Sequence, residues 1–456
     1  MQLFKRSVSA RGLTAFGFEI LLVAGSLLVA TLLYGPANDP AFIWRIVLAT
    51  GLVLVCLYFN DFYDLTIVRS GREVVIRLFQ AGGVASILLA LIYWVLPAVA
   101  VHYRAFFPSL FLLLATILAW RFAFNRLIRT RQLVENVLIV GTGPVALALA
   151  RQIAEQDDFA YRIVGFAADR SAMSTMPPGY PRVLGEKSQI SQIVTLYGVD
   201  RIVVAVQDRR GRLPIDELMH VKLSGVPVEE AATTYERLTG KLMIESIKPS
   251  SLIFSDGFRV FRWRRRAKRG ADVVFSVVGL VLSAIPMALT ALAVWLESEG
   301  PIIYRQERVG QNGRRFTLFK FRSMRVDAEG SGPVWAREGD NRVTRVGRFI
   351  RTTRLDELPQ FWNVLRGDMS FVGPRPERPY FVAQLAREIP FYHERHAVKP
   401  GVTGWAQVKY RYGSSIEDAV EKLRYDLYYV KHLSLVFDLT IVFDTVKVIL
   451  FGKGAQ

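Results

Sequence analysis

Cysteine is nearly missing from this chain of 456 residues, which removes two kinds of chemistry from consideration. The one cysteine, Cys56, lies inside an apolar run, so the chain cannot form an internal disulfide, and neither a cysteine nucleophile nor a cysteine-based metal site is expected. Acidic residues are also scarce, because 40 Asp and Glu stand against 58 Lys and Arg and give a formal net charge of +18. Such a balance favours an anionic partner, either nucleic acid or an anionic lipid surface.

Internal repeats and low-complexity tracts are absent as well, and so is any Tyr-x-x-x-Lys pair. The missing pair excludes the usual catalytic site of a short-chain dehydrogenase or epimerase. What the chain does have is length for two to four domains and an apolar content of 51%, with a mean hydropathy of +0.25. That is too apolar for an ordinary soluble protein, so the basic charge favours a lipid surface over nucleic acid.

Long apolar runs fill the first third of the chain and predict a bundle of four transmembrane helices within residues 1–132. The first run is longer than the core of a typical signal peptide, so an uncleaved anchor is expected. Lys and Arg gather before the first run, between the second and third, and after the fourth, which predicts that both ends of the bundle are cytoplasmic. The four runs span residues 13–34, 41–59, 78–101 and 106–124.

Three charged residues, Glu19, Arg45 and Arg121, fall within these runs or near their ends. Arg121 can extend its side chain toward the membrane surface. Glu19 is either a polar residue of the bundle interior or lies close to the interface, and no function is predicted from it.

Residues 133–250 alternate between short apolar strands and helices, which predicts a Rossmann-like α/β domain with a parallel sheet. The strand at 137–140 runs into a GxGxxA pattern, the fingerprint of a dinucleotide-binding turn. Gly141 and Gly143 would let a phosphate approach the backbone, and Asp169 is the candidate ribose-binding acid. Two interpretations stay open here: a nucleotide-binding domain, and a degenerate domain that regulates or supports the protein.

A basic and aromatic segment, residues 259–269, stands directly before a fifth apolar run at 273–296. This order predicts a lipid-binding linker followed by a membrane helix at 270–297. Basic residues flank the helix on both sides, and Pro286 lies in its middle with Ser283 about one turn earlier. We therefore predict a re-entrant helix that bends and leaves on the same face, with Ser283 satisfying a freed carbonyl. A straight fifth span also fits the hydropathy.

The most informative stretch is residues 351–376, where adjacent carboxylates stand among arginines. Asp356 and Glu357 come just before Pro359, which favours a helix start, and Arg375 lies between two prolines in a stiff loop. Carboxylates supply a nucleophile and ligands for Mg²⁺, and guanidinium groups bind phosphate oxygens bidentately, so the stretch predicts metal-assisted phosphoryl chemistry. For the acid pair alone, an exposed helix cap with surface ion pairs is the alternative.

Short strands and helices follow one another after residue 300. The last helix is amphipathic and carries Asp438 and Asp444, each of which is expected on the solvated face. Strands are expected at 302–304 and 316–321 around a turn at 310–313, and helices at 419–432 and 435–451.

Eight short segments carry a family resemblance: KRGAD at 268–272, YRQERVG at 304–310, FKFRSM at 319–324, LDELPQ at 355–360, GDMS at 367–370, GPRP at 373–376, KPGVTG at 399–404 and YYVK at 428–431. Through them the chain from Lys268 to Val448 resembles the bacterial sugar transferases, the monotopic polyprenyl-phosphate hexose-1-phosphate transferases. The four apolar runs and the Rossmann-like domain resemble the long-form members, which serve exopolysaccharide and O-antigen assembly. Many members have adjacent helix-breaking Ser and Pro, whereas here two residues separate Ser283 from Pro286.

The resemblance implies that a UDP-sugar, expected to be UDP-glucose or UDP-galactose, donates hexose-1-phosphate to undecaprenyl phosphate and releases UMP. It implies Asp356 as the nucleophile that forms a covalent aspartyl-phosphosugar, with Glu357 as its partner at Mg²⁺. It also implies a multi-pass protein of the bacterial inner membrane with cytoplasmic soluble domains, lipid contacts, a homodimer as one option, and no nucleic-acid partner. The further substrate-binding residues implied are Arg351, Arg375, Lys320, Arg322 and Asp438.

The expected architecture has three parts: a membrane α-helical bundle, an α/β Rossmann-like domain, and an α+β monotopic catalytic domain with a re-entrant membrane helix. Their expected ranges are 1–132, 133–250 and 268–456, with a basic linker at 251–267. The competing interpretation is a membrane-anchored NAD-dependent enzyme that modifies sugar nucleotides, and the missing Tyr-x-x-x-Lys pair counts against it. A membrane-tethered nucleotide sensor would leave the acid and arginine cluster without a role.

Overall fold

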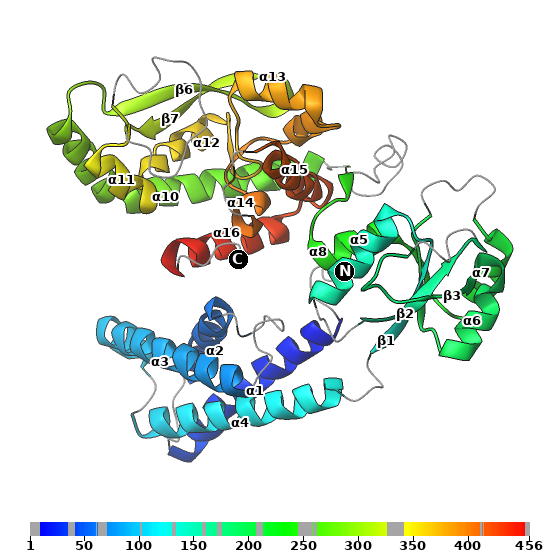
Figure 1. Cartoon of the computed structure of the whole chain (residues 1–456). Helices are drawn as coiled ribbons and strands as arrows, with labels where there is room; N and C mark the ends of the chain where they lie inside the picture. The colour runs from blue at the N-terminus through cyan, green and yellow to red at the C-terminus, as the bar shows by residue number, and fades with distance from the viewer. Residues whose placement is uncertain are drawn as a thin grey trace. The chain divides into compact units, whose positions relative to one another are not determined.

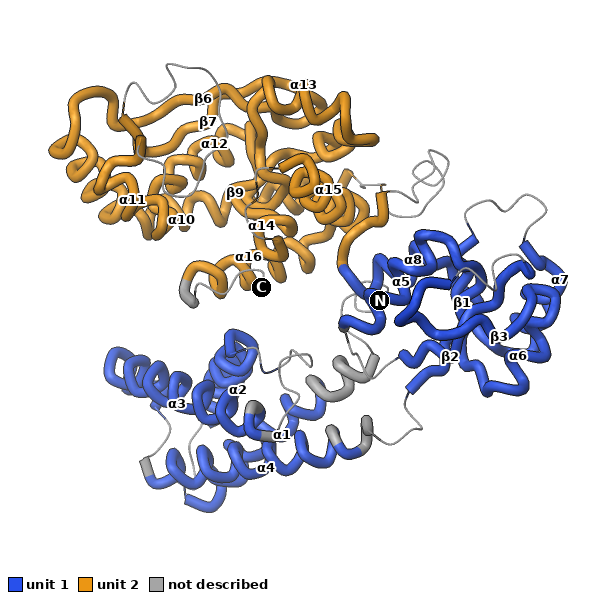
Figure 2. The backbone as a smooth tube through the Cα atoms, in the orientation of Figure 1, with its two compact units in different colours: residues 1–239 blue, residues 240–456 orange. Residues whose placement is uncertain are grey.

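The computed structural model divides into two compact units, Met1–Thr239 and Gly240–Gln456 (Figure 2). The residues that it describes are 10–34, 42–60, 62, 71–100, 103–129, 134–156, 161–170, 176–206, 213–244, 258, 262–325, 342–410, 413 and 415–451.

The four apolar runs at the start of the chain form four helices, as predicted. Side chains that face the other helices are fully buried, while large apolar groups on the outer faces stay exposed, with Trp44 75% and Trp94 83% accessible. An apolar exterior of this kind is what a lipid environment selects. Together with α10 (Arg262–Glu297) they make five described helices long and apolar enough to cross a membrane. The bundle helices are α1 (Ala10–Tyr34), α2 (Phe42–Phe59), α3 (Gly71–Val95) and α4 (Tyr103–Arg129), shown in Figure 1.

An ion pair lies inside this bundle. Arg121 Nε is 2.7 Å from Glu19 Oε1, and the two side chains are 3% and 0% exposed. The Arg121 guanidinium also stands 4.5 Å from the centroid of the Phe62 ring. The prediction that Arg121 reaches for the membrane surface was therefore wrong, and Glu19 lies in the bundle interior.

The α/β domain holds a parallel sheet in the order β3-β2-β1-β4-β5, which confirms the predicted sheet type. This is the order of the first five strands of a doubly wound nucleotide-binding sheet. Its strands are β1 (Glu135–Val140), β2 (Tyr161–Ala168), β3 (Val183–Glu186), β4 (Arg201–Val204) and β5 (Val228–Glu230). The helices around it are α5 (Pro144–Gln156), α6 (Ile190–Tyr197), α7 (Ile215–Leu223) and α8 (Ala231–Thr239), as Figure 1 shows.

The second unit gathers short strands and helices around α10. The predicted hairpin is present as the antiparallel pair β6 (Ile303–Val309) and β7 (Arg315–Phe321). A two-stranded parallel pair, β8 (Ser370–Val372) and β9 (Gly401–Thr403), fixes the loop that follows β8. The remaining helices are α11 (Arg345–Thr352), α12 (Gln360–Arg366), α13 (Pro379–Glu388), α14 (Trp405–Lys409), α15 (Ile416–Lys431) and α16 (Leu435–Phe451).

Helix α10 begins earlier than predicted, because residues 262–269 of the basic segment form its first two turns. Arg and Lys are good helix formers, and Lys268 lies one turn before Asp272, 3.9 Å away. The rest of the predicted linker lies outside the described residues, apart from Phe258. Ser283 Oγ contacts Met287 Sδ at 3.4 Å, so the expected bond to a freed carbonyl is replaced by a weaker one. The re-entrant path stays a prediction.

The second unit starts at Gly240, before the predicted boundary at residue 250. Trp405 Nε1 donates a hydrogen bond to the Gly240 carbonyl at 2.7 Å, and Lys241 pairs with Glu421. Leu242 is 6% exposed and belongs to the core of this unit. The short segment after α8 is thus part of the fold that carries the acid pair.

Candidate active site

The acid pair stands on a single turn between α11 and α12. Thr344 caps the start of α11 by accepting a hydrogen bond from Gly347 N, and the helix ends at Thr352. Arg354 then adopts a left-handed backbone, with φ of 60°, which a non-glycine residue rarely does outside tight turns. The chain reverses there, runs through the 3₁₀ turn Leu355–Glu357, and enters α12 directly after Pro359, close to the predicted helix start.

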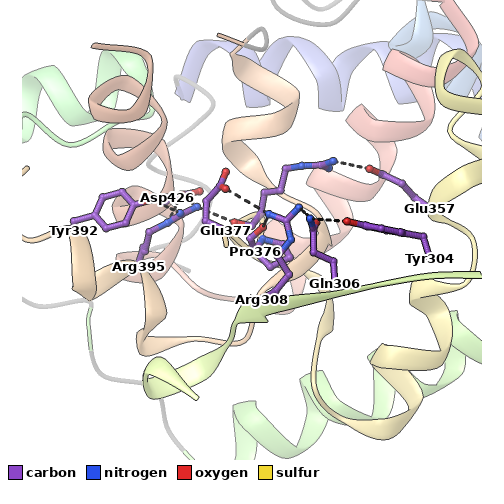
Figure 3. Close-up of polar contacts among 10 residues, drawn as sticks. Tyr304, Gln306, Arg308, Glu357, Pro376, Glu377, Tyr392, Arg395 and Asp426 are labelled. Carbon is purple, nitrogen blue, oxygen red and sulfur yellow. Dashed lines mark hydrogen bonds and ion pairs between the residues drawn. The ribbon is translucent and has the colours of Figure 1, made fainter. Parts of the chain in front are cut away.

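The two carboxylates have different surroundings. Glu357 Oε1 is 2.6 Å from Arg375 Nη2, the dashed line at Glu357 in Figure 3. Glu357 Oε2 is 3.6 Å from Arg354 Nη1. Asp356 is only 7% exposed, yet among the described residues its side chain makes no hydrogen bond or ion pair. Glu357 is therefore held in place, whereas Asp356 keeps its oxygens available.

The pKa values of the pair diverge for the same reason. Burial and the neighbouring Glu357 raise the pKa of Asp356 to about 6, although Lys320, Arg375 and other cations act in the opposite direction. Burial alone would raise the pKa of Glu357, but Arg375 and Arg354 outweigh it and bring that pKa below its ordinary value. Such a split within one acid pair is typical of functional sites.

Lys320 extends from β7 toward the acid pair. Desolvation, with the positive charge of Arg308 next, lowers the pKa of its ammonium to about 8. The Lys320 Nζ also stands 5.3 Å from the ring centroid of Tyr304, on the neighbouring strand. Lys320 thus brings a cation to the carboxylates from the hairpin.

The hairpin contributes a row of side chains that the sequence analysis did not single out. Tyr304, Gln306 and Arg308 alternate along β6, so they share one face. Gln306 donates to Tyr304 OH at 3.2 Å and accepts from Arg308 Nη2 at 2.6 Å (Figure 3). The alternation within YRQERVG was the signal that could have revealed them.

Arg375 reaches the acid pair from the loop between β8 and α13. The stretch from 373 to 378 forms neither helix nor strand, which confirms the stiff loop predicted from its prolines. Arg351, on the last turn of α11, acts on Asp356 as a nearby positive charge. The cations that act on the pair are therefore Lys320, Arg351, Arg354 and Arg375, and they outnumber the two carboxylates.

The fit of the acid pair to Mg²⁺ depends on the acidic side chains around it. No group of three or more His, Cys, Asp or Glu that could hold a metal ion occurs among the described residues. Mg²⁺ is usually bound by one or two carboxylates, with water and substrate phosphates completing its shell. Asp356, buried and without a bonded cation among the described residues, suits that role with Glu357 beside it.

Arg322 lies elsewhere than the sequence suggested. Its Nη2 donates to Ser298 O at 2.6 Å and to Ser298 Oγ at 2.9 Å, just after the end of α10. The side chain is buried at 6% exposure, so it fixes the exit of that helix. The structure does not bring Arg322 to the acid pair.

Asp438 belongs to a second buried cluster. Lys268 Nζ is 2.7 Å from Asp438 Oδ2, and Tyr429 OH donates to Asp438 Oδ1 at 2.7 Å. Burial raises the pKa of Asp438 although Lys268 and Tyr429 oppose the rise. The expectation of a solvated Asp438 was wrong, because this acid ties α16 to α10. Asp444, also expected on the solvated face, has a side chain only 13% exposed, with Lys409 Nζ 3.8 Å from its Oδ2.

In the α/β domain, Gly141, Gly143 and Asp169 follow β1 and β2 at one edge of the sheet. Gly141 has φ of 110°, and a Cβ there would stand 3.1 Å from Ala205 O, so the fold itself requires this glycine. A Cβ on Gly143 would meet nothing within 4 Å. Asp169 is 2.8 Å from Lys187 Nζ, so the candidate ribose acid already has an ion-pair partner.

Comparisons with known proteins cover the part of the chain that carries the acid pair. The family described as bacterial sugar transferase matches residues 263–452, which include the acid pair and the Arg375 loop. A UDP-glucose:undecaprenyl-phosphate glucose-1-phosphate transferase of Caulobacter vibrioides is 43% identical over 190 residues, 41% of this chain and 71% of that protein. The chain belongs to the bacterial sugar transferase family.

Two further relatives align with this sugar transferase over more residues than the Caulobacter protein does. A UDP-N-acetylgalactosamine-undecaprenyl-phosphate N-acetylgalactosaminephosphotransferase of Aeromonas hydrophila is 44% identical over 239 residues, 52% of this chain and 56% of that protein. An undecaprenyl-phosphate glucose phosphotransferase of Komagataeibacter xylinus is 33% identical over 340 residues, 72% of this chain and 61% of that protein. The alignments thus span less than two thirds of either relative. A CoA-binding domain family matches residues 58–213 of the sugar transferase.

Proposed function

We propose that this protein transfers hexose-1-phosphate from a UDP-sugar to undecaprenyl phosphate and releases UMP, at the bacterial inner membrane. The observation that carries the proposal is the buried Asp356 carboxylate, free of hydrogen bonds among the described residues and placed among the cations that act on it. The relatives are named for this kind of transfer, with N-acetylgalactosamine in one name and glucose in another. The proposed donor of this protein is UDP-glucose, UDP-galactose or a UDP-N-acetylhexosamine.

The chemistry runs in two displacements. An oxygen of Asp356 attacks the sugar-bearing phosphorus, a bond to that phosphorus forms, and the bond to the UMP oxygen breaks. An oxygen of undecaprenyl phosphate then attacks the same phosphorus, and the Asp356 carboxylate leaves unchanged. Two steps let the soluble donor and the lipid acceptor use one site in turn.

The cations around the acid pair serve the charge that develops on phosphorus. Phosphoryl transfer depends mainly on positioning and on electrostatic stabilisation of equatorial oxygens. Arg351, Arg375 and Lys320 are proposed to bind those oxygens, since each already acts electrostatically on Asp356. Glu357 orients Arg375 through the 2.6 Å contact.

Asp356 and Glu357 would hold Mg²⁺ together with the donor phosphates. When bound, this ion supplies neutralisation of the diphosphate and of the leaving UMP. Asp356 remains the group that bonds to phosphorus, and Glu357 keeps Arg375 in place.

The membrane side of the proposal rests on α10. Exposed apolar residues cover one side of this helix, among them Val281, Leu282 and Ile285, while its first turns are basic. We propose that α10 re-enters the bilayer and leaves on the cytoplasmic face, where the headgroup of undecaprenyl phosphate lies. Cytoplasmic soluble domains and a homodimer are part of the same proposal.

The test is UMP release by the full chain in lipid nanodiscs, with undecaprenyl phosphate, Mg²⁺ and a panel of UDP-sugars. Wild type should release UMP with at least one donor, and Asp356→Asn should not. Asp368→Asn is a matched control, since Asp368 is an acid just past the end of α12 that pairs with Arg366. Intact mass spectrometry without lipid acceptor should show a hexose-phosphate adduct on Asp356. Turnover by Asp356→Asn, or an adduct on another residue, contradicts the assignment.

A further inference from the structure

The loop that carries Arg375 is fixed by an unusual set of hydrogen bonds. Two of its residues are prolines, which donate no backbone hydrogen bond, so its carbonyl oxygens must anchor it. Every carbonyl from 374 to 377 has a donor, and two of the four donors are arginine side chains. The bonds run from Gly401 N to Pro374 O (2.9 Å), Arg395 Nη2 to Arg375 O (3.0 Å), Arg308 Nη1 to Pro376 O (3.1 Å) and Val309 N to Glu377 O (2.9 Å).

Arg395 is the donor that holds Arg375 itself, and it is deeply buried. It lies on the 3₁₀ segment Tyr392–Ala397 and is 5% exposed. Its Nε and Nη2 donate to Asp426 Oδ2 at 3.0 and 2.7 Å, and its Nη1 donates to Tyr392 OH at 2.8 Å (Figure 3). Asp426 is 2% exposed, so the pair is sealed from water.

A buried ion pair of this kind is weak evidence for stability, because desolvation of both charges offsets their attraction. The pair matters more for where it directs the Arg395 guanidinium than for how much it stabilises the fold. The donors of a planar guanidinium have fixed directions. Because Asp426 Oδ2 holds one side of the Arg395 guanidinium, Nη2 is also directed at the Arg375 carbonyl oxygen. A lysine ammonium in its place would lack that fork.

We propose that Arg395, oriented by Asp426 and Tyr392, is a positioning residue for the transfer reaction. It fixes the backbone of Arg375, and through it the 2.6 Å contact between Arg375 and Glu357. This inference rests on the proposed function, because the Arg375 side chain is assigned there to the donor phosphates. Arg395 does not touch substrate itself and acts through Arg375.

The experiment is a double-mutant cycle on the full chain in nanodiscs. Arg395→Lys and Tyr392→Phe are each made in wild type and in Arg375→Ala, and kcat/KM is measured by UMP release. In wild type, Arg395→Lys should lower kcat/KM by about 10- to 100-fold, mostly in kcat, since misplacement of a positioning group by about 1 Å has effects of that size. In the Arg375→Ala background it should change kcat/KM by less than about twofold.

The conservative Tyr392→Phe keeps the Asp426 pair and should give a smaller loss with the same dependence on Arg375. If Arg395→Lys does not fold, Tyr392→Phe and Arg375→Ala still form a complete double-mutant cycle.

Arg201→Lys is the matched control, because Arg201 also pairs with two acids, Glu135 and Glu229, but in the other unit. It should leave kcat/KM unchanged. The positioning role is overturned if Arg395→Lys and Tyr392→Phe each lower kcat/KM by the same factor with and without Arg375, while wild type stays active. A wild type that releases no UMP from any donor overturns the proposed function and this inference together.

Discussion

Replacing Asp356 by asparagine should make the protein inactive and more stable at the same time. The carboxylate is buried, and burial together with Glu357 raises its pKa from 3.8 to about 6. An acid whose pKa is raised by folding keeps a proton in the folded state that the unfolded chain would release. The free energy of unfolding therefore falls as the pH rises from about 4 to about 6, and it stays reduced above that window.

The size of the effect follows from the shift. A difference of about 2 pKa units corresponds to about 3 kcal/mol at pH 8, since one unit is worth about 1.4 kcal/mol. Asparagine has nearly the same shape and no charge, so Asp356→Asn should recover up to about 3 kcal/mol at pH 8 and almost nothing at pH 4. The site thus holds a functional carboxylate at the expense of stability.

Hydrogen exchange is the appropriate assay, because a chain with several domains does not unfold in one step. Amides of α12, which follows the acid pair directly, should exchange about 100-fold more slowly in Asp356→Asn than in wild type at pH 8. The gain should disappear toward pH 4. Asp368→Asn, just past the C-terminal end of α12, should change the exchange rates little at either pH. Faster exchange in Asp356→Asn at pH 8, or a gain independent of pH, would refute the reasoning.

In a pH profile of wild-type kcat/KM, activity should rise through about pH 6 as Asp356 ionises and fall through about pH 8 as Lys320 loses its proton. Lys320→Met removes a cation that lowers the pKa of Asp356, so its acid limb should move to higher pH, and an unmoved limb would argue against that contact. Glu299→Cys, in a chain whose native cysteine is serine, should resist an impermeant thiol reagent in intact cells and react after lysis if α10 re-enters; labelling from outside would establish a fifth span. A fragment that begins at Gly240 should have a higher melting temperature than one that begins at Ser255. The shorter fragment loses two apolar side chains of the core cluster, worth about 1.5–3 kcal/mol each. Equal melting temperatures would contradict the placement of that segment.

Local patterns predicted much of the fold because they report local physics. Alternation and turn residues located the hairpin, and hydropathy located the four helices of the bundle. Asp356 and Glu357, followed by Pro359, predicted a turn with two acids just before a helix, and the structure has that turn. These features depend on neighbours within a few residues, which the sequence shows directly.

The residues that were misplaced depend on distant partners. Asp438 looked like a solvated acid on an amphipathic helix, but its partner Lys268 lies 170 residues earlier. Arg322 lies two residues after Lys320, just past the end of β7, yet it stands at the exit of α10, where Ser298 accepts its hydrogen bonds. No periodicity in one element can state which element packs against it, so these assignments needed the tertiary structure.

The ion pair between Glu19 and Arg121 has a consequence for how the anchor is made. Glu19 lies on α1 and Arg121 on α4, so α1 leaves the ribosome before the helix that carries its ion-pair partner. A lone charge in hydrocarbon is costly, and Glu19 lacks its neutralising partner until α4 has been synthesised. The bundle is therefore expected to reach its final packing only after α4 joins it.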